Sequence, residues 1–537
     1  MSTATPRRRR PLSALIDVPP IRDVHPPDWF ERLPRRLTTA ALLLALVIVS
    51  AFLRTRQLGG QLWFNEAIAT GIAGHSLSQL PGVLRAAGAS PLYYLLLHIW
   101  IQLFGSGESA THTLTVLFTL LTIPAGWWVA QGLAGRRAGI FAAVLFAFNA
   151  YLTHFSQETQ PYALLVLLGL LSTGGFVQAF VHRRRRYLWL FTLGLTALLY
   201  TQGSAGLFAF GALAAFAVVW RLAPDRSGLL RDAAIGFGAP CVLYLPWLPT
   251  TIDQISHATS PWHYAPLLGA TVPSDLLGGE RVDATLLVAA VVGLAPLLAR
   301  ERRRTPEAIT VWALIALPVA ALLLARVSSL VSPSWVSRYF APMVATLLLL
   351  AALSAARAKV IGVAVIVLCV GFLANPSSFV PTYKSDLRDV AGELGPVLHA
   401  QDLVVVGQPE QTPLAQYYMP GGLRFADTTG IVSDPTYMNW SGAQARLQHA
   451  SPAATLGPLV ASLKPGQQLL FVRPLTEGVQ NWQEPWTKLV RRRSAQWGQI
   501  LTTDVASGTL QRVASAPHYY RSACCVANSA ILYQKVP

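Results

Sequence analysis

The chain has 537 residues, of which 53% are hydrophobic and only 12% are charged. Soluble domains carry about 25% charged residues, and the mean hydropathy of +0.43 also lies on the apolar side. Apolar runs of about 17–22 residues recur from Leu37 to Leu373, each close to the length that crosses a bilayer. Composition therefore excludes an ordinary soluble protein and predicts a polytopic α-helical membrane protein.

The formal net charge of +17 comes largely from basic residues that cluster between the apolar runs. An excess of Lys and Arg in short loops marks the cytoplasmic side of a membrane protein. The charge is thus a signal of topology, and no nucleic-acid partner is predicted. The clusters are Arg136–Arg137, Arg183–Arg186, Arg221 with Arg226 and Arg231, Arg300 with Arg302–Arg304, and Arg357 with Lys359.

The first 36 residues form a basic tail that contains Arg7–Arg10 and Arg35–Arg36. Nothing after the first apolar run resembles a cleavage site, so this run is predicted to be an uncleaved first helix. Because the tail resembles the basic loops in charge, residues 1–36 and the N-terminus are expected to be cytoplasmic.

The segment Pro91–Phe104 decides the predicted topology. It is apolar but only 14 residues long, and the polar stretch Gly105–Ser109 follows it. A span needs about 20 residues. Counting the segment as a span places Arg136–Arg137 outside, whereas an interfacial helix keeps every basic loop inside. We therefore predict an interfacial helix.

Eleven membrane spans follow from this choice, with an outer loop and interfacial helices at 54–110. The topology places 23 of the 42 Lys and Arg residues inside, six in the outer loops and 13 beyond residue 375. Around Thr201–Gly203, one long tilted helix is the alternative to two spans. The spans are expected near 37–53, 111–133, 139–155, 162–181, 187–201, 204–220, 232–248, 284–299, 307–325, 341–356 and 359–374.

The chain changes character after the membrane domain, which is predicted to cover 37–375. From 376 to 537, polar residues and Pro or Gly interrupt short apolar runs such as Leu403–Val406, Leu469–Val472 and Ala530–Tyr533. A helix is expected around Asp386–Leu398. This pattern predicts a soluble α/β domain, and an odd number of spans makes it extracytoplasmic.

The cysteines and a search for nucleotide-binding motifs give little information about function. Cys241 and Cys369 lie in predicted spans and are expected to pack there. The adjacent pair Cys524–Cys525 has two alternatives, a strained vicinal bridge or thiols that are free or partly oxidised. The sequence contains no zinc-ligand spacing, Walker sequence or nucleotide fingerprint, which argues against an ATP-driven pump.

Two carboxylates, Glu66 and Glu158, lie just outside predicted spans and on the same outer side. Ionised groups near hydrocarbon are costly unless they line a cavity, so two that converge from separate loops form a candidate site. Solvated loop acids are the alternative for each. A lipid-linked sugar donor suits this site, because transfer needs a base, groups that hold the phosphate and an apolar groove for the lipid.

Arg338 lies at the outer mouth of a predicted span and is the candidate group for that phosphate. A guanidinium binds phosphate oxygens in a fork and keeps its charge. Arg85 is a second candidate. The alternative for Arg338 is an interfacial anchor beside Tyr339 and Trp335.

Four motifs, in order along the chain, resemble those of glycosyltransferase family 39. These are membrane enzymes of the GT-C superfamily that include protein O-mannosyltransferases and lipid A aminoarabinose transferases. The resemblance covers about 37–375, and the outer domain is similar only in general kind. The motifs are Trp63–Ala67, Ser90–His98, Ser156–Glu158 with Pro161–Leu164, and Ser337–Tyr339.

The resemblance implies the GT-C fold and an inverting transfer from a polyprenyl-phosphate sugar to an extracytoplasmic glycan, lipid or protein. The enzyme is expected in the cell membrane, with membrane lipids as further partners. No cofactor is predicted from the sequence; a divalent metal stays an open alternative, although the sequence contains no ligand motif for one. The predicted site residues are Glu66, Glu158 and Asn65 for catalysis, Arg338, Tyr339 and Arg85 for the donor phosphate, and Trp63, Tyr93, Tyr94, His98 and Gln157 for sugar or acceptor.

The sequence departs from the family pattern at Asn65, where an Asp usually precedes the Glu and acts as base. Asn cannot accept the proton. Either Glu66 or Glu158 takes the role, or the protein is a non-catalytic or altered relative that binds glycan or lipid. A secondary transporter is a third class, but the sequence shows no internal repeat and its acids lie at span ends.

Overall fold

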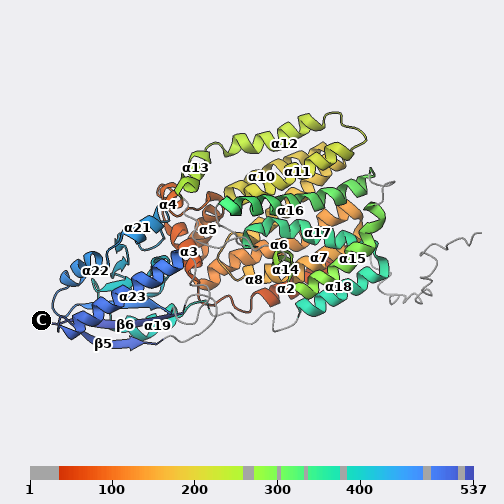
Figure 1. Cartoon of the computed structure of the whole chain (residues 1–537). Coiled ribbons are helices and arrows are strands. Elements are labelled where there is room, and N and C mark those ends of the chain that lie inside the picture. Colours follow the sequence, from red (N-terminus) through yellow and green to blue (C-terminus); the bar gives the residue numbers. More distant parts are fainter. Residues whose placement is uncertain are drawn as a thin grey trace, which may run out of the picture. The chain divides into compact units, whose positions relative to one another are not determined.

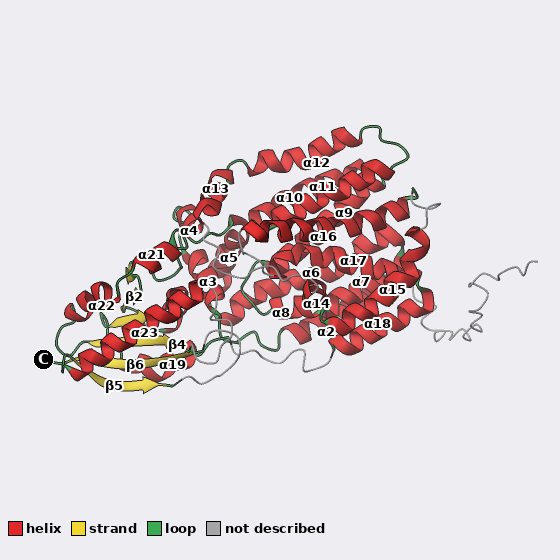
Figure 2. Cartoon of the chain, viewed as in Figure 1, coloured by secondary structure: helices red, strands yellow, loops and turns green. Residues whose placement is uncertain are grey.

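The computed structural model describes residues 35–257, 271–298, 304–331, 337–374, 384–475, 485–517 and 527–537. Helices make up the first part of the chain, whereas the strands all lie beyond residue 400 (Figures 1 and 2). The helices before residue 375 are α2 Arg35–Arg54, α3 Phe64–Gly74, α4 Leu80–Ala86, α5 Pro91–Phe104, α6 Glu108–Ala134, α7 Arg136–Phe148, α8 Ala150–Phe155, α9 Tyr162–Phe176, α10 Leu188–Thr201, α11 Ala205–Leu222, α12 Leu229–Tyr244, α13 Leu248–His257, α14 Thr271–Leu277, α15 Glu280–Leu298, α16 Pro306–Val331, α17 Ala341–Arg357 and α18 Lys359–Leu373.

A helix lies over each of the eleven predicted spans, but the number of spans stays a prediction. Among the described residues, six helices are long and apolar enough to cross a membrane. A seventh span arises if α12 and the start of α13, bent by 73° at their junction, act as one. Large apolar side chains point outward from these helices, as at Phe52 and Leu323, which are 63% and 62% exposed. Such faces are typical of contact with lipid.

Helix α9 lies at the centre of the membrane part. It begins the apolar segment Tyr162–Val181, and 89% of the most apolar stretch of this segment is buried. Small residues allow neighbouring backbones to approach it closely. At Gly169 an added Cβ would lie 2.6 Å from the carbonyl oxygen of Pro342 in α17. The C-terminal end of α7 is held by Arg54, whose guanidinium donates to the Phe146 carbonyl oxygen at 2.8 Å.

Short helices occupy the segments predicted to lie outside the bilayer. The apolar segment forms α5 with the predicted bounds, Pro91–Phe104, although its position at the interface stays a prediction. Residues 202–204 separate α10 from α11, so two helices form where one long helix was the alternative.

The C-terminal part contains a six-stranded sheet in the order β3-β2-β1-β4-β6-β5. Central strand β1 pairs in parallel with β2 and β4, whereas β3, β6 and β5 join antiparallel. The strands are β1 Leu403–Val406, β2 Arg424–Asp427, β3 Gly430–Val432, β4 Gln468–Pro474, β5 Leu510–Ala516 and β6 Asn528–Lys535. The helices are α19 Leu387–Leu394, α20 Thr412–Tyr418, α21 Ala443–His449, α22 Pro452–Ala461 and α23 Pro485–Ala506. The α/β architecture and the three apolar runs agree with the sequence prediction, and Cys524–Cys525 lie outside the described residues.

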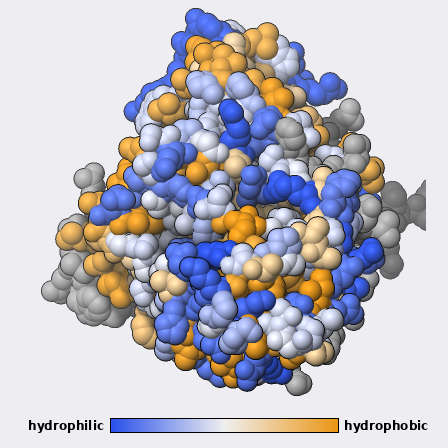
Figure 3. Space-filling view, turned by 90° about the vertical axis from the view of Figure 1, so that its left-hand side faces the viewer, coloured by the Kyte–Doolittle hydropathy of each residue, from blue (hydrophilic) through white to orange (hydrophobic). Residues whose placement is uncertain are grey.

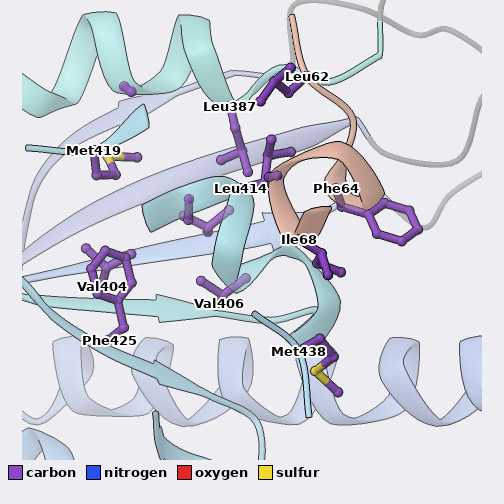
Figure 4. Packing of buried hydrophobic residues seen from close by; sticks show 14 of the residues in the cluster. Leu62, Phe64, Ile68, Leu387, Val404, Val406, Leu414, Met419, Phe425 and Met438 are labelled. Carbon is purple, nitrogen blue, oxygen red and sulfur yellow. The ribbon is translucent and has the colours of Figure 1, made fainter. Parts of the chain in front are cut away.

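Alternate residues of β1 belong to two different cores. Leu403 and Val405 pack with side chains of α22 and α23. Val404 and Val406 face the other side of the sheet, where their cluster includes Phe64 of α3 (Figure 4). The apolar sequence of β1 fits a parallel strand that is buried on both faces.

The second core joins the sheet to the outer helices of the membrane part. Figure 4 shows Leu62, Phe64 and Ile68 on one side, with Leu387 and Leu414 beside them.

The face shown in Figure 3 mixes hydrophilic and hydrophobic residues without a continuous apolar band. Such a surface is typical of contact with water.

Candidate active site

Glu66 lies in the first turn of α3, at the third helical position. Its Oε2 accepts a hydrogen bond from the backbone N–H of Trp63 at 2.8 Å. A Glu at the third helical position commonly makes this bond to the residue that precedes the helix. The positive end of the helix dipole also favours a carboxylate here. Local sequence thus fixes Glu66 as a buried, ionised group.

Three further groups donate hydrogen bonds to the Glu66 carboxylate. Oε1 accepts from His112 Nε2 of α6 at 2.7 Å and from the Thr159 backbone N–H at 2.8 Å. Oε2 also accepts from Lys384 Nζ at 2.9 Å. Burial alone would raise the pKa of Glu66, but the charges of Lys384 and His112 outweigh it and hold that pKa well below the usual range.

His112 is as constrained as the acid that it contacts. Its Nδ1 lies 2.7 Å from the Leu58 carbonyl oxygen, while Nε2 faces Glu66. Both nitrogens therefore face oxygen atoms, which fixes the orientation of the ring. Its side chain, like that of Glu66, is fully buried.

Glu158 lies in the turn between α8 and α9 and has a different environment. Its Oε1 is 3.2 Å from His154 Nε2. Among the described residues, its buried Oε2 has no hydrogen-bond partner. Asn149 orders this region, because its Oδ1 accepts from the Leu152 backbone N–H and caps α8. Glu158 thus keeps one acceptor atom available.

Arg338 is the second residue of the short 3-10 turn Ser337–Phe340 before α17. Its guanidinium carbon lies 5.8 Å from the centre of the Trp63 ring. Tyr151 of α8 donates to the Arg338 carbonyl oxygen at 3.3 Å, which joins this turn to the Glu158 region. Within the described part of the chain, Arg338 Nε and Trp63 Nε1 are both buried donors without an acceptor.

The remaining catalytic and phosphate candidates are spread more widely. Asn65 is half-buried, and its carbonyl oxygen accepts from Gln160 Nε2 at 2.7 Å. Tyr339 adjoins Arg338 in the same 3-10 turn. Arg85 makes a long hydrogen bond of 3.5 Å to Thr250 of α13, so the structure gives it a partner other than the two acids.

The residues predicted to contact sugar or acceptor have mainly packing contacts. Tyr93 is buried in a cluster of apolar residues, with Tyr94 at its edge. His98 Nδ1 lies 2.8 Å from the Ala73 carbonyl oxygen and thereby joins α5 to α3. Gln157 contributes its carbonyl oxygen, which accepts a hydrogen bond from Lys384.

Sequence reasoning missed His112 and Lys384. His112 lies at the outer end of a predicted span, where an ionisable residue is a signal for a site. Lys384 carries no comparable signal, because it lies in an ordinary polar stretch of the C-terminal domain. Among the described residues, no group of three or more His, Cys, Asp or Glu side chains is arranged to hold a metal ion.

Comparison with known proteins addresses the family and the fold. Residues 88–243 match the family model described as dolichyl-phosphate-mannose-protein mannosyltransferase. This stretch contains the Ser90 and Glu158 motifs but not those of Glu66 or Arg338. A search of curated proteins found no match.

Several solved glycosyltransferases have a similar structure. ArnT from Cupriavidus metallidurans, bound to undecaprenyl phosphate, is 14% identical with a TM-score of 0.57, over 93% of this chain and 98% of that one. The oligosaccharyltransferase AglB from Archaeoglobus fulgidus, in complex with an inhibitory peptide and a dolichol-phosphate, is 12% identical with a TM-score of 0.53, over 82% and 70%. The mycobacterial arabinofuranosyltransferase AftD is 15% identical with a TM-score of 0.53, and the match covers 94% of this chain but 40% of that one. The match over 88–243 and the similarity to these solved structures confirm the resemblance of this chain to membrane glycosyltransferases of the GT-C fold.

Proposed function

We propose that the protein transfers a sugar, with inversion, from a polyprenyl phosphate to a hydroxyl of an extracytoplasmic acceptor. The acceptor oxygen bonds to the anomeric carbon while the bond from that carbon to the phosphate oxygen breaks. The acceptor proton passes to a carboxylate, and the lipid phosphate leaves. ArnT and AglB, which share the fold, were solved with undecaprenyl phosphate and dolichol-phosphate, in support of this class of donor.

One observation favours Glu158 over Glu66 as the base. The Glu66 oxygens accept four hydrogen bonds between them, including one from Lys384, so protonation would break an ion pair. The Glu158 Oε2 is buried and has no donor in the described part of the chain. A general base must have a lone pair within reach of the acceptor proton. Glu158 meets this need, and Glu66 is left to hold its neighbours in place.

The donor phosphate is assigned to Arg338. A buried guanidinium N–H without an acceptor is costly unless a ligand completes it. The indole N–H of Trp63, beside the same guanidinium, is a second unpaired donor. Two donors at one position suit an anion whose charge increases as the sugar departs.

The alternative of a non-catalytic relative rests on Asn65, which replaces the family's Asp. Here Glu158 supplies the basic oxygen that Asn65 lacks. Transfer needs an oxygen that can take up the acceptor proton, and the Oε2 of Glu158, which none of the described residues contacts with a donor, can do so. We therefore favour transfer, with the N-terminus in the cytoplasm and the site and sheet domain outside the cell membrane.

Purified protein in lipid nanodiscs provides the test. Binding of undecaprenyl phosphate is measured first, and transfer is then followed from radiolabelled polyprenyl-phosphate sugars to envelope fractions of the source organism. We expect saturable lipid binding and transfer from at least one donor. Binding without transfer from any donor would support the non-catalytic alternative, and comparison of envelope glycans with and without the protein would identify the product.

A further inference from the structure

A polar cavity lies beside α3, on the side of the helix that faces α20. Its volume is about 680 Å³, which lies within the range of ligand pockets, about 300–1,000 Å³. Its walls come from α3, the connection between α5 and α6, α20 and the segment before α21. The lining residues that bear on the argument are Thr70, His75, Gln79, Gln416, Tyr417 and Thr436.

Small residues on one face of α3 create the space. Ala67, Thr70, Gly71 and Gly74 recur at the spacing that places side chains along one side of a helix. Gly71 is required for this approach, because an added Cβ would overlap the carbonyl oxygen of Thr436. The membrane part and the sheet domain therefore build the cavity together.

Several polar groups in this cavity have no hydrogen-bond partner among the described residues. Thr70 is 5% exposed, and none of the described residues bonds to its hydroxyl. No hydrogen bond to a described residue involves the side-chain amide of Gln416, which is half-buried. Gln79 Oε1 accepts from Ser76, so its amide nitrogen is left to donate. An unpaired hydroxyl and two amides offer donors and acceptors together.

An aromatic ring is held at the same cavity. The Tyr417 hydroxyl donates to the Ser106 carbonyl oxygen at 2.9 Å, which fixes the ring between α20 and the α5–α6 connection. Aromatic rings offer a rigid, apolar contact surface with a polar tip. Such a ring suits a ligand that has an apolar face and a polar edge.

The cavity carries little charge, in contrast to the site at Arg338. The lining residues include no Lys, Arg, Asp or Glu, and the Nε2 of the one lining histidine, His75, lies 2.9 Å from Asp434 Oδ2. A phosphate or a carboxylate would find no unpaired cation among the lining residues. The lining instead matches a neutral compound with many hydroxyl groups.

The position of the cavity connects it to the reaction. Thr70 follows Glu66 by four residues, so both lie on one face of α3 about 6 Å apart along the axis. We propose that the cavity binds a non-reacting sugar unit of a neutral glycan acceptor, an inference that rests on the proposed function. Binding energy from such a unit holds the acceptor in place for attack.

The test uses neutral glycans released from the cell envelope of the source organism and separated from charged ones. Binding to the full-length protein in nanodiscs is followed by saturation-transfer NMR and titration. We expect Thr70→Val and Gln416→Leu each to weaken binding of the neutral fraction about tenfold or more. Thr192→Val is the matched control, because Thr192 in α10 also has a buried hydroxyl without a partner among the described residues but does not line the cavity. It should leave binding unchanged.

In transfer assays, Thr70→Val should raise the KM for the glycan acceptor while kcat stays within about twofold, the pattern for lost uniform binding. Transfer could fail altogether while glycan binding persists and responds to Thr70→Val; the cavity assignment would then stand and the proposed reaction would fall. Binding only of charged glycans or peptides, or equal binding by Thr70→Val and the wild type, would overturn the assignment.

Discussion

Lys384 Nζ lies 2.9 Å from Glu66 Oε2, although 318 positions separate the two residues along the chain. The acid belongs to α3 in the outer part of the membrane domain, and the lysine enters from the sheet domain. The pair is well buried, with side-chain exposures of 0% for Glu66 and 17% for Lys384. The sheet domain therefore contributes directly to the environment of the candidate active site.

Replacement of Glu158 tests the assigned base. Glu158→Gln keeps the shape of the side chain and removes the basic oxygen, so kcat for sugar transfer should fall by about 10²-fold or more. Binding of undecaprenyl phosphate should stay within about threefold of the wild type. Adding Gln160→Glu to Glu158→Gln should not recover kcat. Glu158→Asp, which keeps a carboxylate at this position, should retain part of the wild-type rate. Near-normal kcat in Glu158→Gln would exclude Glu158 as the base.

The ion pair between Glu66 and Lys384 predicts a thermodynamic coupling. Loss of one partner leaves a buried charge, which costs about 3–5 kcal/mol, whereas loss of both costs less. Lys384→Met and Glu66→Gln should each lower the thermal midpoint in detergent, and the double variant should be more stable than the sum of the two effects predicts. Simple additivity of the two shifts would contradict a direct interaction.

Arg338 should control the donor rather than the acceptor. Arg338→Ala should weaken binding of undecaprenyl phosphate and reduce transfer, because the guanidinium contact strengthens as the phosphate gains charge. Arg338→Lys should recover only part of both, since an ammonium cannot form the fork. Arg85→Ala is the control and should change lipid binding less. Normal lipid affinity and turnover in Arg338→Ala would reduce the residue to an interfacial anchor.

Acid should reveal the depressed pKa of Glu66. A carboxylate whose pKa is lower in the folded than in the unfolded protein stabilises the fold above its unfolded pKa, about 4.3, and loses this effect as pH falls. The difference in thermal midpoint between wild type and Glu66→Gln should therefore be constant from pH 7 to 5 and shrink below about pH 4. A difference that grows on acidification would reverse the assigned direction.

The orientation can be tested with single cysteines at Ser227 and Ser451, both exposed residues. In a background without the natural cysteines, a membrane-impermeant maleimide should label Ser451→Cys in intact cells. Ser227→Cys should react only after the membrane is opened, because the basic loop around it is expected inside. The opposite pattern of labelling would invert the topology.

The sequence predicted local and repetitive features well. The bounds of α5 follow from Pro91 and the polar stretch after Phe104, and β1 coincides with the apolar run Leu403–Val406. These elements depend on composition within a few residues. The partner of Glu66 depends instead on how a distant domain packs, and neither charge nor spacing near Lys384 indicates that contact. The same holds for the cavity beside Thr70, which exists only because two parts of the chain meet.

The contact between Asp386 and Asn528 determines when the site can be completed during biosynthesis. Asp386 lies two residues after Lys384, and its Oδ2 accepts from the Asn528 backbone N–H at 2.9 Å, at the first position of β6. The ribosome makes all the described membrane helices before it makes β6. Glu66 therefore emerges early and meets Lys384 only after the sheet has folded. Newly inserted chains should pass through a stage in which the membrane domain is present but the contact between Glu66 and Lys384 has not yet formed.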